Sequence, residues 1–513
     1  MPTQMLSSRP RPPRRPGRSD RSLGITGVAL LLGSAMLAPA FASGPAAPPA
    51  AATPAPVPEI AVTRYTLDNG LTVLLSEDHR LPVVATEVRY RVGSGHEAKG
   101  RSGFAHLFEH LMFQGSQHYD NEYFKPFEPI GGNVNGTTNV DRTNFYEQVP
   151  SNALELSLWM QAERMRFLLP AMTQAKLDNQ RDVVKNERRQ RYENTPYGEV
   201  WRLVSENLYP VGHPYQHTTI GSHEDLTAAS MDDVKAFFEQ YYSPSNAILT
   251  LVGDFDPAVV RPKIEQYFGG APKGARVPAP QPAAPKLDRA IHIVEKDQVN
   301  LARIHLAWHT PAVFADGDAA LDVWASVLTD GKSSRLYQPL VYEQKVAKDV
   351  AAMQVSNHLT SVFMVQATVA PGRTVEELST ALLAALRASL EQPPTDDELA
   401  RTLSGWRKSF YGRVEGVLSR AQLLSGYEHF VGRPDFLRAD LERYTALTSG
   451  AVHSAARRWL PAAEPTQFLR VDIVPETPAA AAVPPPPPAK APGPKPGKKP
   501  GKAARSGAEK GQP

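Results

Sequence analysis

The chain has 513 residues, of which 42% are hydrophobic, and it contains no cysteine. This length exceeds one ordinary hydrophobic core and predicts two domains with additional tails. The absence of cysteine excludes disulfides, thiolate metal sites and a cysteine nucleophile, so histidines and carboxylates are the available strong metal ligands. The net charge of +3 comes from basic ends, because residues 1–22 and 477–513 together hold thirteen Lys and Arg and only two acidic residues. The body is therefore acidic, and we expect no nucleic-acid partner.

The N-terminus has the pattern of a secretory signal peptide. A basic segment, Arg9 to Arg21, precedes an apolar one, Leu23 to Leu37, and Ala40-Phe41-Ala42 matches the small-residue cleavage pattern. We expect residues 1–42 to direct export to the periplasm or cell envelope of a bacterium, with cleavage after Ala42. The alternative is a retained membrane anchor, because the stretch from Leu23 to Ala42 is almost long enough to span a bilayer.

Three segments rich in proline and alanine divide the rest of the chain. Residues 43–58 form an Ala/Pro linker, residues 269–288 form a second Pro/Ala linker, and residues 475–513 form a Pro/Ala/Lys tail. Such composition cannot bury enough apolar surface to fold, so we expect the tail to be disordered. These boundaries predict a first domain at residues 59–268 and a second domain at residues 289–474.

Both predicted domains begin with strands and continue with helices. In the first domain, strands are expected within Tyr65–Asp78, with a hairpin turn at Asn69-Gly70, and within Val83–Gly93. In the second domain, strands are expected within Arg289–Thr310, and a helical pattern starts at Asp316. Strands followed by runs of helices predict two α+β domains, and the repeated order favours a duplication.

A short apolar segment of the first domain carries the main functional prediction. Residues Phe104 to Phe113 follow a strand and a glycine-rich turn and have the composition of a buried helix. On a helix, His106 and His110 lie at i and i+4 with their imidazoles on one face, and Glu109 sits on an adjoining edge. Two neutral imidazoles suit a divalent metal such as zinc, and a carboxylate beside them can accept a proton from the attacking water. This His-x-x-Glu-His order is the inverted metallopeptidase signature.

The alternative for these three residues is a purely structural role. A lone histidine in an apolar helix is usually a hydrogen-bonded core residue. Two histidines and a glutamate would instead require three costly polar groups to be satisfied in one buried place without any function. We therefore prefer the metal-binding interpretation.

A zinc site of this kind needs a third protein ligand and one position left for water. The candidate is Glu187, which lies in the charged helical segment Leu177–Gly198. Val183 and Val184 indicate the buried side of that helix, and Glu187 follows them by four and three residues. A carboxylate on the buried side needs a cation, whereas most other charges of the segment are expected to face solvent.

Four segments together resemble the pitrilysin/insulinase family, which includes the mitochondrial processing peptidase. They are "GFAHLFEHLMFQGS", "GGNVNGTTNVDRTNFYEQVP", "VVKNERRQRYENTPYG" and "YYSPSNAILTLVGDFD". The resemblance covers about residues 60–474 and is closest to the short bacterial members. It implies two homologous α+β domains in one chain, each a mixed sheet packed with helices, and two chains that close as a clam shell.

The resemblance also implies a role for each residue of the proposed metal site. His106, His110 and Glu187 would bind one zinc ion per chain, and Glu109 would be the general base. One position departs from the family pattern, because many members have a second glutamate seven residues before the third ligand and this chain has Gln180 there. A glutamine can still hydrogen-bond a ligand, so we expect Gln180 to tune the site.

The segment "NVNGTTN" resembles the family's substrate-pairing edge. A peptide would lie there as an added strand beside Asn135, Gly136 and Thr138, and backbone pairing would give affinity with little sequence preference. The alternative for this segment is an ordinary Asn/Gly/Thr turn.

The function implied is that of a zinc-dependent endopeptidase that hydrolyses peptides or unfolded segments. One alternative is a non-catalytic structural or scaffolding homologue, a role that family members take after losing the motif, which is intact here. Another alternative, a metal-dependent hydrolase for a different substrate class, is disfavoured by the resemblance.

The second domain lacks two residues that active family members use. The half that faces the zinc site usually supplies an arginine and, seven residues later, a tyrosine, in a segment that resembles Ser333–Met353. An ungapped placement puts Val341 and Lys348 at these positions, although Tyr342 is only one residue away. We therefore expect a heterodimer whose partner is a homologous chain that lacks the zinc motif and supplies the Arg/Tyr pair. A homodimer with a substituted anchor is the alternative.

Overall fold

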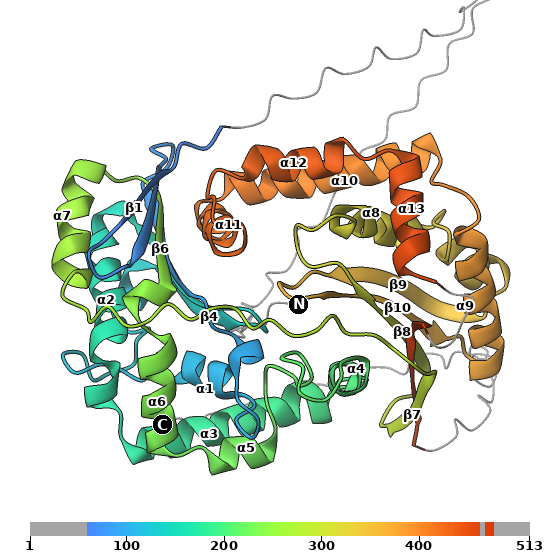
Figure 1. Ribbon diagram of the computed structural model, residues 1–513, viewed down its shortest axis with the longest axis horizontal. Helices are drawn as coiled ribbons and strands as arrows, with labels where there is room; N and C mark the ends of the chain where they lie inside the picture. Colours follow the sequence, from blue (N-terminus) through green and yellow to red (C-terminus); the bar gives the residue numbers. More distant parts are fainter. Residues whose placement is uncertain (1–58, 462–466, 477–513) are drawn as a thin grey trace, which may run out of the picture.

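The structure is a computed structural model that describes residues 59–461 and 467–476 (Figure 1). The predicted signal peptide, the first linker and all but two residues of the predicted tail lie outside the described residues. The described chain forms two α+β halves, each with one mixed β-sheet and several helices, as predicted. Among the described helices, none combines the length and the apolar character that a membrane crossing requires.

The first half is built on a six-stranded sheet with the order β1-β2-β6-β3-β5-β4. Its strands are β1 (Thr63–Thr66), β2 (Thr72–Glu77), β3 (Val83–Tyr90), β4 (Asn133–Thr138), β5 (Thr143–Pro150) and β6 (Ala247–Gly253). Strands β1 and β2 are an antiparallel pair, and Gly70 between them has a φ of 88°, a left-handed conformation that favours glycine. The predicted turn at Asn69-Gly70 is therefore confirmed. Strand β4 forms one edge of the sheet.

Four helices of the first half, α3, α5, α6 and α7, begin at side-chain caps. Thr173 accepts a hydrogen bond from the Lys176 N–H at the start of α3, and Ser230 with Asp233 forms a capping box at the start of α6. The helices are α1 (Phe104–Leu111), α2 (Leu154–Ala171), α3 (Gln174–Arg188), α4 (Val200–Leu208), α5 (His223–Ala228), α6 (Met231–Tyr241) and α7 (Pro257–Phe268).

The second half repeats this order on a five-stranded sheet, β7-β11-β8-β10-β9. Its strands are β7 (Ile291–Asp297), β8 (Arg303–Thr310), β9 (Ala347–Val355), β10 (Ser361–Val369) and β11 (Leu469–Pro475). Its helices are α8 (Asp318–Thr329), α9 (Val375–Ser389), α10 (Asp396–Glu415), α11 (Val417–Phe430), α12 (Leu437–Thr445) and α13 (Ser449–Trp459). In both sheets, the last strand of the half lies between its first long strand and the next, which supports the predicted duplication.

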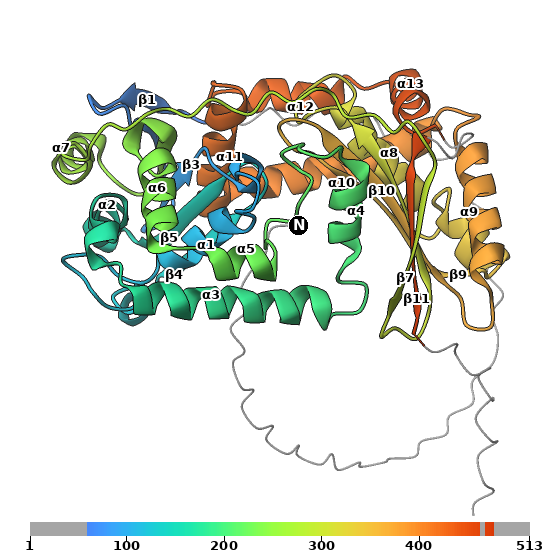
Figure 2. The ribbon, with the colours of Figure 1, turned by 60° about the horizontal axis from the view of Figure 1, so that its bottom comes forward.

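Each half contributes one helix that packs on the sheet of the other half. Helix α11 of the second half packs on β3 and β6, and helix α4 of the first half packs on β8 and β11 (Figures 1 and 2). Two ion pairs hold α11 in place. Arg420 lies 2.9 Å from Asp78, and both side chains are buried; buried Glu428 lies 2.9 Å from the exposed Arg64. The segment 269–288 contains no helix or strand. The predicted domain boundaries stay a prediction. Buried residues of the two halves also pack together in one hydrophobic cluster that crosses the boundary.

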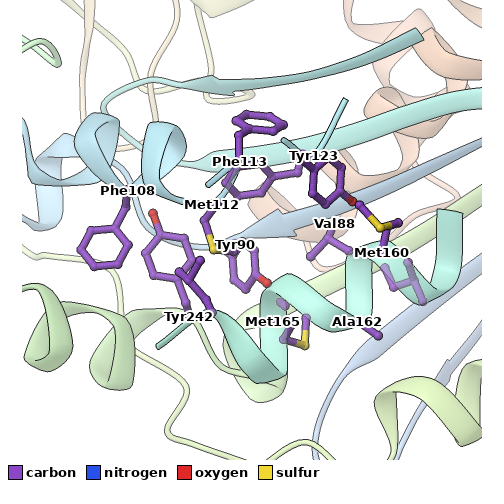
Figure 3. Close-up of a cluster of buried hydrophobic side chains, with 14 of the residues drawn as sticks. Val88, Tyr90, Phe108, Met112, Phe113, Tyr123, Met160, Ala162, Met165 and Tyr242 are labelled. Carbon is purple, nitrogen blue, oxygen red and sulfur yellow. The ribbon is translucent and has the colours of Figure 1, made fainter. Parts of the chain in front are cut away.

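The core of the first half holds α1 against the sheet. Phe108 stacks on Tyr242 with ring centroids 5.1 Å apart, and Tyr242 in turn lies 4.8 Å from the ring of Tyr90 on β3 (Figure 3). Phe104 and Leu111 are also fully buried. Burying such side chains is worth about 1.5–3 kcal/mol each, so the apolar residues of α1 fix the helix that carries the histidines.

Candidate metal centre

Two residues fix the start of α1. They are Gly103 and Glu97, and the sequence indicated no role for Glu97. Gly103, the residue before the helix, has a φ of 88°, and a Cβ there would come within 2.7 Å of the Ile220 carbonyl oxygen. The Glu97 carboxylate accepts hydrogen bonds from the N–H groups of Gly103, at 2.8 Å, and Ala105, at 2.7 Å. Glu97 thereby satisfies amides that a helix N-terminus leaves unpaired.

Helices α1 and α3 pack together and bring three of the predicted site residues into one group. The ligand atoms of His106, His110 and Glu187 all lie within 4.8 Å of one another. Nε2 of His110 is 3.2 Å from Glu187 Oε2, and Nε2 of His106 is 3.7 Å from the same oxygen. Both histidines are buried, so the three donors face one another in a protected position.

The chemistry of this group fits a zinc ion. His110 Nε2 is buried and makes no well-aligned hydrogen bond, although Glu187 Oε2 lies 3.2 Å away, so a cation between the two groups would satisfy both. Burial, with a smaller contribution from His110, lowers the pKa of His106 to about 3, so its imidazole is neutral at pH 7. Burial opposes ionisation of Glu187, but contacts with the two histidines and Arg191 outweigh it and lower the pKa of Glu187 to about 2. Neutral imidazoles and an ionised carboxylate are the forms that bind zinc.

Glu109 lies beside this group and is held by strand β4. Its Oε2 accepts a hydrogen bond of 2.6 Å from Thr138 Oγ1. Burial raises the pKa of Glu109, and the hydrogen bond from Thr138 opposes that rise. A Cβ on Gly136 would lie 3.1 Å from Glu109 Cγ, so only glycine leaves this side of the carboxylate uncrowded. Of the three residues predicted to pair with substrate, Thr138 therefore holds Glu109 and Gly136 leaves space beside it, roles that the sequence did not indicate.

The third predicted substrate residue, Asn135, accepts a hydrogen bond of 2.8 Å from the Gly136 N–H. All three residues lie on β4, whose other side has no paired strand among the described residues. An unpaired edge can accept an added strand, so the geometry is compatible with the predicted pairing, which stays a prediction.

One expectation for α3 differs from the structure, and another, the role of Gln180, stays a prediction. Val183 is 39% exposed, so it does not mark the buried side of α3. The buried residues of this helix are spaced by three or four positions, and they are Leu177, Gln180, Val184 and Arg188. Gln180 is buried, but the structure gives it no hydrogen bond to His106, His110 or Glu187. The group that does contact a candidate ligand is Arg191, whose Nη1 lies 2.8 Å from Glu187 Oε1.

A cavity of about 210 Å³ opens beside the candidate metal centre. Its polar wall includes His106, Glu109 and Glu187, and both halves contribute to the rest of its lining. Its apolar part includes Trp201 and Val204 of α4, Val355 and Val362 of the second half, and Val140 and Ile220 from other parts of the first half. The cavity therefore gives access to Glu109 and to two of the three candidate ligands, His106 and Glu187.

Comparison with known proteins identifies related sequences. Residues 72–218 match the family model "Insulinase (Peptidase family M16)", and residues 228–405 match "Peptidase M16 inactive domain". The chain is 31% identical over 367 residues to the zinc protease PqqE of Helicobacter pylori, covering 71% of this chain and 82% of that protein. It is 23% identical over 401 residues to the uncharacterized zinc protease YmxG of Bacillus subtilis, covering 77% and 95%.

Solved structures give the same result for the fold. A crystal structure of a protease from Helicobacter pylori matches with a TM-score of 0.75 and 27% identity, covering 81% of this chain and 100% of that one. The periplasmic protease PqqL from Escherichia coli matches with a TM-score of 0.66 and 17% identity, covering 81% and 48%, a likeness of fold alone. This chain belongs to the M16 peptidase family, that of insulinase and pitrilysin, and is a homologue of its zinc proteases.

Proposed function

We propose that the chain is a zinc-dependent endopeptidase that hydrolyses peptides or unfolded protein segments. The observation that carries this proposal is the convergence of His106, His110 and Glu187 within 4.8 Å, with Glu109 adjacent in the wall of the same cavity. A structural role for these four residues would leave His110 Nε2 buried with a contact to Glu187 that is not a well-aligned hydrogen bond. The relatives described as zinc proteases support the same conclusion.

Zinc, when bound, would polarise the scissile carbonyl and acidify a water molecule. Glu109 would accept the proton of the attacking water and later donate it to the leaving amine. Thr138 holds Oε2 of Glu109 and thereby fixes the orientation of the carboxylate, which leaves Oε1 free to take the proton. Burial raises the pKa of Glu109, which brings this group closer to the range where a general base is effective.

The substrate would bind as an extended chain along β4. Asn135, Gly136 and Thr138 lie on this edge strand, and Thr138 also lines the cavity. Backbone pairing to an edge gives affinity without strong sequence preference, and a folded protein cannot supply the required free strand. We therefore expect unfolded segments and peptides to be the substrates.

The active assembly would be a heterodimer. Tyr342 is 68% exposed, and Lys348 is also exposed, at the start of β9. A homologous partner chain without the zinc motif would supply the Arg/Tyr pair and stabilise the charge that develops on the carbonyl oxygen, a type of contact worth several kcal/mol. A homodimer would instead have to use a substituted anchor.

The site of action would be the periplasm or cell envelope of a bacterium. The support for this proposal is the sequence pattern of residues 1–42. The related fold of PqqL belongs to a protein described as periplasmic. Fractionation of cells that express the full chain, with sequencing of the mature N-terminus, would test both export and cleavage after Ala42.

A single experiment separates the proposed enzyme from a scaffold. Zinc content of the purified chain and turnover of a quenched generic peptide are measured in the same preparation, alone and with the candidate partner. A zinc peptidase binds one zinc per chain and cleaves the peptide in at least one of the two conditions. A chain that binds zinc but does not cleave under either condition would contradict the proposal and favour the scaffolding role. Full activity of the chain alone would contradict the heterodimer.

A further inference from the structure

The third candidate ligand has two oxygens that face different partners. Glu187 Oε2 points to the histidines, at 3.2 Å from His110 Nε2 and 3.7 Å from His106 Nε2. Oε1 lies 2.8 Å from Nη1 of Arg191, one helical turn further along the chain. Each oxygen of the carboxylate therefore already has its own partner in the structure.

Arg191 is held where it can make this contact. It lies in a π-helical turn, Arg189–Glu193, that directly continues α3. Buried Arg188 anchors the turn, because its side chain donates to the Gly221 carbonyl oxygen at 2.9 Å and to Glu193 Oε1 at 3.1 Å. Turns of this kind are often found at functional sites. Among the described residues, Glu187 is the one ion-pair partner found for Arg191.

The arrangement decides how many donors the protein gives to the metal. If both oxygens of Glu187 were bound, two imidazoles and two oxygens would fill a tetrahedral set and leave no position for water. An arginine that holds Oε1 prevents this, because the guanidinium is always charged and directional in its hydrogen bonds. With Oε1 occupied, Glu187 offers one oxygen, and three protein donors remain.

The geometry points to Arg191 as a positioning residue that restricts Glu187 to one-oxygen binding of zinc and so keeps a coordination position open. This inference rests on the proposed function, because it needs zinc at the site of His106, His110 and Glu187. It goes beyond that function because it names a residue outside the His-x-x-Glu-His motif that keeps the coordination position open. Arg191 also lines the cavity, so an effect on substrate binding is the competing explanation that the experiment must separate.

The test measures the metal directly in three variants. Zinc affinity is determined by competition with a chelating dye, and cobalt is substituted for zinc so that its visible spectrum reports the set of donor atoms around the metal. Arg191→Gln removes the charge, and Arg191→Lys keeps it but loses the planar fork. Arg189→Gln is the matched control, since Arg189 lies on the same turn, is exposed and contacts Asn186 at 2.6 Å rather than Glu187. The thermal unfolding midpoint of each variant shows whether it is folded.

The expected result is that Arg191→Gln weakens zinc binding by about 10–100-fold, the usual effect of losing a contact to a metal ligand. The cobalt spectrum of this variant should also change, because the second oxygen of Glu187 would replace water as the fourth donor. Arg191→Lys should fall between Arg191→Gln and the wild type, and Arg189→Gln should match the wild type in both measurements.

Two results would overturn the inference in distinguishable ways. If wild-type protein binds no zinc, both the proposed function and the role of Arg191 are refuted. If wild-type protein binds zinc, and Arg191→Gln keeps the wild-type zinc affinity and cobalt spectrum while only the KM for peptide rises, then Arg191 acts on the substrate. In that case the positioning role of Arg191 is refuted, and the proposed function is not.

Discussion

The substitution Glu109→Gln isolates the proposed general base. Glutamine has nearly the same size as glutamate, and its amide oxygen can still accept the hydrogen bond from Thr138 that now ends on Oε2. Because Glu109 is not among the three grouped ligands, zinc binding should not change. The one property that is lost is the ability to accept a proton from water.

The expected loss of activity follows from this single change. General acid–base catalysis contributes about 10²–10⁴-fold, so kcat should fall by that factor. This corresponds to about 3–5 kcal/mol of transition-state stabilisation, at 1.36 kcal/mol for each factor of ten. The structure favours the upper part of the range, since the carboxylate is buried and no other acidic side chain besides the ligand Glu187 is found in the described lining of the cavity.

The assay is turnover of a quenched peptide, with zinc content and the thermal unfolding midpoint measured on the same sample. The variant should be folded and zinc-loaded but nearly inactive. A matched control is Glu224→Gln, a first-turn carboxylate of α5 outside the cavity lining, which should retain wild-type activity. Activity of Glu109→Gln above about one per cent of wild type would refute the role of Glu109 as the base.

Four further predictions address the groups around the site. Thr138→Val removes a hydrogen bond that lowers the pKa of Glu109, so this pKa should rise and the acid limb of the kcat profile should move to higher pH; an unchanged limb would contradict the contact. Gly136→Val places methyl groups where Cβ alone is 3.1 Å from Glu109 Cγ, so kcat should fall while circular dichroism stays native. Glu97→Ala leaves two amides at the start of α1 unpaired and should destabilise the protein by about 1–3 kcal/mol in urea unfolding, whereas unchanged stability would exclude the cap. A fragment of residues 59–268 lacks α11 and should show no cooperative unfolding; a sharp transition would show that the first half folds alone.

The local elements near the site could be predicted because their signals are contiguous in the sequence. Helix α1 follows from a short apolar run with two histidines at i and i+4, and the hairpin before β2 follows from Asn69-Gly70. The sequence points to Glu187 as the third ligand through its place on a charged helix, and the family resemblance implies the same role. Its position on α3 was argued partly from Val183, which the structure shows to be exposed.

The long-range arrangement could not be predicted in this way. An amphipathic helix looks the same whichever sheet it covers, so nothing in the composition of α4 or α11 indicates that each packs on the sheet of the other half. Insertion of β6 between β2 and β3 likewise depends on pairing between residues far apart in the chain. Arg191 and Glu97 were missed for a different reason, because a charged residue in a polar segment gives no sign of its partner.

Anomalous diffraction at the zinc absorption edge, from crystals of the zinc-loaded protein, tests the central claim most directly. The account predicts one strong peak per chain, at about 2.0–2.2 Å from an imidazole nitrogen of His106, an imidazole nitrogen of His110 and one oxygen of Glu187. A peak at any other set of residues would contradict this account. So would the absence of a peak from folded protein that was crystallised with excess zinc.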